Sequence, residues 1–85
     1  MREISWTITD PDGVHARPAG KFVELMQRYS SDITITRGDK TADAKKLFAL
    51  MKMRIKLGEI IVVKACGGDE EEAAAAALGF LKEHL

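Results

Sequence analysis

The sequence predicts a two-layer α+β fold in which helices cover one face of a sheet of four short strands. Residues 2–9 alternate apolar and polar side chains, as a half-buried strand does. Residues 59–65 form a continuous β-branched run, which is typical of an inner strand. Apolar residues recur at helical spacing over 18–29 and over 74–85. With the shorter segments between them, the predicted order is β-α-β-β-α-β-α, in a single domain over residues 1–85.

A turn separates the first strand from the first helix. In "DPDG", Pro11 presets the backbone for a type I turn and Gly13 ends it. Proline is tolerated in a first helical turn, so the helix begins close to Pro18, at a residue from His15 to Arg17. Its apolar stripe runs to Tyr29, and "SSD" ends it.

The middle of the chain predicts two short strands and one short helix. The strands are 33–36 and 41–42, joined by the turn "RGDK". The helix lies within residues 43–58, a segment that ends at Gly58. Its inner face is formed by Leu47, Leu50 and Met51.

The last strand and helix are separated by a glycine turn. Residues 59–65 are apolar on both faces, which places the strand inside the sheet. A lone cysteine forms neither an intramolecular disulfide nor a cysteine-based zinc cage. Cys66 is therefore interpreted as a small buried hydrophobe, with a reactive thiol as the alternative. Asp69 is expected to cap the last helix, whose predicted buried stripe is Ala74, Ala77, Leu78, Leu81 and Leu85.

Composition argues against several function classes. Thirteen basic side chains balance thirteen acidic ones, so no overall field attracts nucleic acid or an anionic membrane, and any anion site must be local. No apolar run approaches the roughly 18 residues of a membrane span, and no signal peptide is recognised. We therefore expect a cytoplasmic protein without membrane insertion. The two histidines are far apart in sequence and no carboxylate pair supports a metal site, so no metal is expected.

The stretch "GVHARPAG", residues 13–20, places His15 at the start of the first helix. Unpaired N–H groups and the positive end of the helix dipole favour a phosphate there. We expect the backbone amides of Ala16 and Arg17, at the helix start marked by Pro18, to hold the oxygens, and the Arg17 guanidinium to add charge. His15 would then be a nucleophile for phosphoryl transfer. The alternative is an ordinary exposed loop histidine.

These residues resemble a known family. "GVHARPA" after a turn, with "SSDI" before the second strand and "DEEEA" opening the last helix, resembles HPr, the histidine-containing phosphocarrier of the bacterial sugar phosphotransferase system. The resemblance covers the whole chain. It implies an open-faced β-sandwich, with a four-stranded antiparallel sheet and three helices on one face. It also implies that His15 accepts a phosphoryl group at Nδ1, that Arg17 is its electrostatic partner, and that no cofactor is bound.

The resemblance also implies partners. Phosphorylated enzyme I would donate to this chain and IIA domains of sugar permeases would accept from it, so the chain would be a monomeric carrier and not an enzyme. The family's docking surface around the first two helices corresponds here to Gly20, Lys21, Glu24, Leu47, Phe48, Met51 and Lys52. Phe48 lies off the apolar face of its helix, which favours partner contact, with a contact to a satellite core as the alternative.

The resemblance fails at one position. Many members carry a regulatory serine where this chain has Lys46, so control by a serine kinase through that site is not expected. This lysine and its basic neighbours suggest an alternative, a specialised regulatory paralogue, for example of a nitrogen-type phosphotransferase system, that binds regulatory proteins. A nucleic-acid-binding module is a third and remoter reading, which the neutral charge and the lack of stacking aromatics oppose.

Overall fold

Four strands and three helices follow one another in the predicted order in the computed structural model, which describes all 85 residues. The sheet has the order β1-β4-β2-β3, and every neighbouring pair is antiparallel. The elements are β1 (Arg2–Thr7), α1 (Ala16–Met26), β2 (Asp32–Arg37), β3 (Lys40–Asp43), α2 (Leu47–Lys52), β4 (Ile60–Cys66) and α3 (Glu70–His84).

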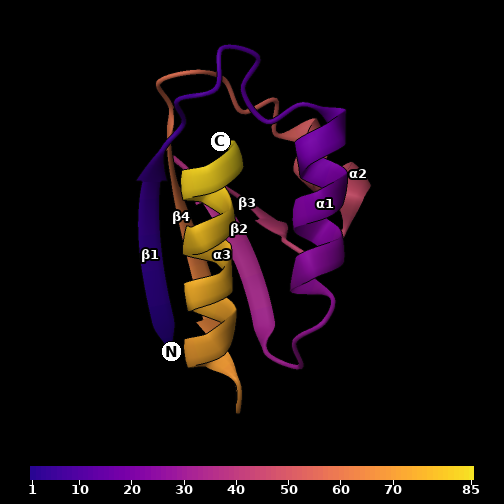
Figure 1. Cartoon of the computed structure of the whole chain (residues 1–85), viewed down its shortest axis with the longest axis vertical. Coiled ribbons are helices and arrows are strands. Elements are labelled where there is room, and N and C mark those ends of the chain that lie inside the picture. The colour runs from indigo at the N-terminus through magenta and orange to yellow at the C-terminus, as the bar shows by residue number, and fades with distance from the viewer.

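The helices lie on one face of the sheet and leave the other face open (Figure 1). α3 packs against β1 and β4, α1 lies beside α3, and α2 lies between α1 and the edge strand β3. The fold-class prediction is therefore confirmed, as is the inner position of β4, which pairs with β1 on one side and β2 on the other. Trp6 on β1 is half-buried and packs against the core, in keeping with the half-buried strand predicted over residues 2–9.

Strand periodicity makes the prediction for Cys66 wrong. On β4 the side chains of Ile61, Val63 and Ala65 are buried under the helices. Successive strand residues point to opposite faces, so Ile60 and Cys66 lie on the open face. Cys66 is accordingly an exposed free thiol and not a buried hydrophobe.

The first two helices end earlier than their apolar patterns predict. α1 ends at Met26, because the Arg28 and Tyr29 N–H groups bond carbonyls three residues back in a tightened turn. α2 ends at Lys52, because Arg54 adopts a left-handed φ of 50° that stops the helix. The segment that follows α2 brings Ile55 into the core.

Some residues that were predicted to face inward are less buried than expected. On the six-residue α2, Leu50 is buried and Met51 is half-buried, but Leu47 in the first turn is 39% exposed. On α3, Leu78 is half-buried, whereas the buried stripe consists of Ala73, Ala74, Ala77, Leu81 and Leu85.

Asp69 occupies the N-cap position of α3, but its side chain does not cap the helix. The carboxylate instead accepts hydrogen bonds from the hydroxyl of Ser31 and from the backbone N–H groups of Ser30 and Ser31. These bonds, led by that of the Ser31 hydroxyl, lower the pKa of Asp69 to about 2. These hydrogen bonds of Asp69 thus connect the segment after α1 to the start of α3.

Candidate functional site

A tight turn between β1 and α1 sets the position of the histidine. The Gly13 N–H bonds the Asp10 carbonyl at 2.9 Å, which confirms the predicted turn. Gly13 has a φ of 65°, and its Cα lies close to the backbone of the segment after α2. The next N–H, of Val14, bonds the Ile55 carbonyl at 3.0 Å. The loop that carries the histidine is therefore held against residues far along the chain.

His15 is the N-cap residue of α1, in an extended conformation, and its side chain makes no capping bond. Its own N–H bonds the Gly13 carbonyl, and its carbonyl accepts the Ala19 N–H, the first bond of the helix. Three residues lie between His15 and Ala19. Pro18 has no N–H, and the N–H groups of Ala16 and Arg17 find no acceptor in the chain. The predicted free amides therefore lie beside the imidazole, which is 42% exposed.

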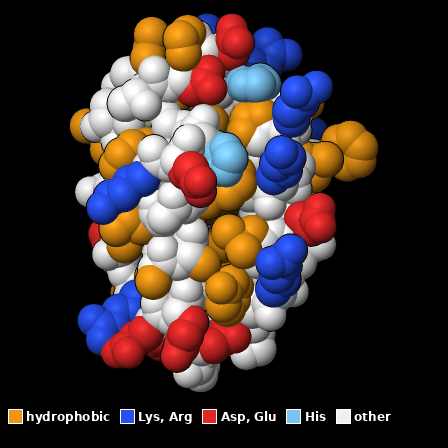
Figure 2. All heavy atoms as spheres, in the orientation of Figure 1, with side chains coloured by type: hydrophobic (Ala, Val, Ile, Leu, Met, Phe, Trp, Pro, Cys, Tyr) orange, Lys and Arg blue, Asp and Glu red, His pale blue; other side chains and the backbone are white.

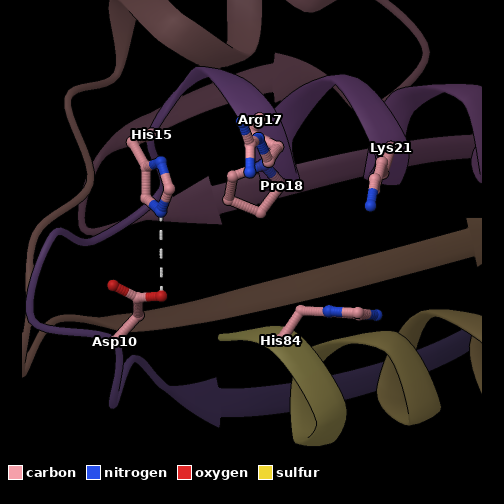
Figure 3. Close-up of a pocket in the computed structure, with 6 residues that line it drawn as sticks. All are labelled: Asp10, His15, Arg17, Pro18, Lys21 and His84. Carbon is pink, nitrogen blue, oxygen red and sulfur yellow. Dashed lines mark ion pairs between the residues drawn. The ribbon is translucent and has the colours of Figure 1, made fainter.

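A hollow of about 180 Å³ opens between the start of α1 and the end of α3 (Figure 3). Arg17 and Lys21 line it from α1, and Asp10 lines it from the turn. Neither cation forms an ion pair, so both charges are available to an incoming group. The complete lining is Asp10, His15, Arg17, Pro18, Lys21 and His84.

His84 in this hollow was not predicted from the sequence. It comes from the last turn of α3, and its ring packs at a tilt against that of Phe80, with centroids 4.5 Å apart. Phe80 in turn lies 5.5 Å from the ring of the buried Phe22 on α1. The packing of α1 on α3 thus brings both histidines to one face, where they are the two pale blue groups in Figure 2.

Two aspartates approach His15, although the sequence alone indicates no carboxylate pair that supports a metal site. Asp10 Oδ2 lies 3.8 Å from His15 Nε2, and ligand atoms of Asp10, Asp12 and His15 all lie within 4.8 Å of one another. Such a group could hold a divalent cation. However, Arg17 and Lys21 line the same hollow, and their fixed positive charges favour an anion there.

The predicted docking residues lie on two neighbouring helices beside the hollow. Phe48 is 83% exposed, which excludes the alternative of a contact with a satellite core. Figure 2 shows Lys and Arg side chains in a column over α1 on the same face as the histidines. Of the predicted set, Gly20 and Met51 are half-buried, and Lys21, Glu24, Leu47, Phe48 and Lys52 are exposed.

None of the three helices has the length and hydropathy needed to cross a bilayer.

Comparison with known proteins agrees with the fold and with the histidine motif. A family model described as "PTS HPr component phosphorylation site" matches residues 2–83. The phosphocarrier protein HPr of Haemophilus influenzae is 44% identical over 58 residues, which are 68% of each chain. A multiphosphoryl transfer protein of Xanthomonas campestris pv. campestris is 41% identical over 66 residues, which are 78% of this chain but 8% of that protein.

A solved structure of the histidine-containing phosphocarrier protein from Mycoplasma superimposes with a TM-score of 0.94 at 34% identity. The superposition covers 96% of this chain and 93% of the other. The likeness therefore extends over both the sheet and the helices.

Proposed function

Because the chain belongs to the HPr family of phosphotransferase-system phosphocarriers, we propose that it accepts a phosphoryl group on His15 and passes it to a second protein. One observation carries this proposal: an accessible imidazole lies beside the two unpaired amides of Ala16 and Arg17 and the free Arg17 guanidinium. Hydrogen-bond donors in this arrangement suit the three equatorial oxygens of a phosphoryl group in transfer.

The transfer uses the His15 imidazole, the two unpaired amides and the Arg17 guanidinium, together with groups that the partner protein supplies. The Nδ1 lone pair of His15 attacks phosphorus, the bond from phosphorus to the donor atom breaks, and its electron pair stays with the donor. The amides and Arg17 hold the phosphoryl oxygens while the group passes between proteins. The reverse steps deliver it to an acceptor, so the chain is a carrier and has no turnover of its own.

The partners of this carrier are a phosphorylated enzyme I as donor and IIA domains as acceptors. The similarity to part of a multiphosphoryl transfer protein supports a place in such a relay. Docking involves α1 and α2, where the exposed aromatic ring of Phe48 supplies an apolar anchor beside the cations Lys21 and Lys52. The reaction takes place in the cytoplasm.

The specialised regulatory paralogue is the less favoured reading. The relatives that match over most of both chains are phosphocarriers. Lys46 has no hydroxyl group for a serine kinase, and it stands as the N-cap residue of α2. Its substitution bears on regulation and not on the carrier reaction at His15.

The proposal is tested by incubating the protein with enzyme I and phosphoenolpyruvate. We expect one acid-labile, base-stable phosphate on the wild type and none on His15→Ala. The matched control is His84→Ala, which removes the only other imidazole and should retain the phosphate. An unlabelled wild type, under conditions that charge a known HPr, would overturn the proposal.

A further inference from the structure

We propose that Asp10 is a positioning residue for phosphoryl transfer, whose carboxylate keeps the ring proton of His15 on Nε2 and so leaves the Nδ1 lone pair free. This inference rests on the proposed function and adds a residue outside the histidine motif. The two side chains face each other across the edge of the hollow in Figure 3.

The carboxylate of Asp10 is fixed in place by its own turn. Its Oδ1 accepts the N–H of Asp12 at 2.8 Å, which leaves Oδ2 directed at the imidazole, 3.8 Å from Nε2. The backbone N–H of Asp10 donates to the carbonyl of Leu85, and its carbonyl accepts the N–H of Gly13. Three hydrogen bonds thus hold the residue, and its side chain is 24% exposed.

The position of this charge distinguishes the two ring nitrogens. A neutral imidazole has one N–H and one lone pair, and a hydrogen bond or negative charge at one nitrogen favours the proton there. Asp10 faces Nε2, so it stabilises the form with the proton on Nε2. Among the ion pairs of the chain, His15 is the only partner of Asp10, so no cation neutralises that carboxylate.

The same contact strengthens during the reaction. When Nδ1 forms its bond to phosphorus and the donor keeps the electron pair of the broken bond, the proton remains on Nε2 and the ring gains a positive charge. The Asp10 carboxylate then faces a cation, and contacts of this kind often shorten in the reacting complex. When the group leaves, the pair of the P–N bond returns to Nδ1, and no proton has moved.

The variant Asp10→Asn isolates the charge. An asparagine side chain carries a carbonyl oxygen that can still accept the Asp12 N–H, so the turn is retained while the negative charge is removed. Asp10→Glu keeps the charge on a longer side chain. Asp32→Asn is the matched control, because it removes an exposed carboxylate that does not line the hollow. Asp32 lies at the start of β2, where it pairs with Cys66 at the end of β4.

The test is ¹⁵N NMR of the His15 ring at about pH 9, where an ordinary histidine is neutral. We expect the ratio of the Nε2–H to the Nδ1–H form to fall about two- to fivefold in Asp10→Asn, to stay unchanged in Asp32→Asn, and to be at least partly restored in Asp10→Glu. An unchanged ratio in Asp10→Asn, with an intact fold by ¹H–¹⁵N spectra, would overturn the proposal.

A second measurement separates this inference from the function on which it rests. In the enzyme I assay, we expect the initial phosphorylation rate of Asp10→Asn to fall several-fold, with the phosphate still on His15. If the wild type accepts no phosphate, the proposed function fails whatever the ring ratio. If Asp10→Asn is charged at the wild-type rate, the proposed function survives and the role of Asp10 does not.

Discussion

At residue 13 the chain needs a glycine for two separate reasons. A φ of 65° is rarely adopted by other residues, and a Cβ added there would lie 2.9 Å from the Cα of Lys56 and against the Ile55 carbonyl oxygen. Gly38 has a φ of 62° but no atom within 4 Å of such a Cβ. A comparison of Gly13 with Gly38 therefore separates the cost of backbone strain from the cost of a close contact.

Gly13→Ala should destabilise the protein by more than Gly38→Ala, because only the first adds a backbone clash to the strain. We expect about 1 kcal/mol for Gly38→Ala and at least about 2 kcal/mol for Gly13→Ala, measured by urea unfolding. Equal losses would show that the contact with the segment after α2 does not hold the histidine loop.

At Asp69, stability depends on pH. Its pKa in the folded protein is lowered to about 2, so the carboxylate stabilises the fold above about pH 4 and this contribution is lost as the pH falls towards 2. Asp69→Asn should therefore be less stable than the wild type at about pH 6, and the gap should narrow by about pH 2. Urea unfolding at both pH values measures it, and a gap that is constant with pH would contradict the assignment.

At the scale of the elements, α1 and α2 have different tasks. α1 buries Phe22, Val23 and Met26 and exposes its free amides at the N-terminus, so it positions the site. α2 is six residues long and buries only Leu50, which leaves Phe48 exposed. An exposed aromatic on so short a helix contributes little to the fold, which is why it suits a contact with another protein.

Phe48→Ala should leave the free energy of unfolding within about 0.5 kcal/mol of the wild type and weaken binding to enzyme I about tenfold. Calorimetric titration of the unphosphorylated protein measures the affinity. Ile60→Ala is the control, since Ile60 is 60% exposed on the sheet face away from the helices. If both variants bind alike, α2 lies outside the docking surface.

At the scale of the whole molecule, one core joins the sheet to all three helices, and β4 contributes its centre. Ile61 is fully buried there, while its neighbour Ile60 points to the open face. Ile61→Ala should cost about 2–4 kcal/mol and Ile60→Ala less than about 0.5 kcal/mol, in single cooperative urea transitions. Similar losses at the two positions would contradict the one-sided sheet.

Some features of the fold and of the site could be predicted from local sequence patterns, and others depend on contacts across the whole molecule. Alternation along β1, the continuous β-branched run in β4, the helical spacing in α1 and α3 and the position of Pro18 are all local patterns. The element order, and a start of α1 next to His15, followed from them. The end of α2 did not, because it depends on a left-handed Arg54, which has no glycine to signal it. The approach of His84 to the hollow beside His15 depends on the packing of α3 against α1, and no local pattern encodes that.

In the proposed function, the phosphoryl group on His15 lies between the unpaired amides of Ala16 and Arg17 and the Arg17 guanidinium. ¹H–¹⁵N and ³¹P NMR before and after phosphorylation by enzyme I test it most directly. We expect phosphorus to couple to Nδ1 of His15 and the Ala16 and Arg17 amide protons to shift far downfield, with the β3 amides unmoved. Phosphate on another residue, or Ala16 and Arg17 amides that do not shift, would contradict it.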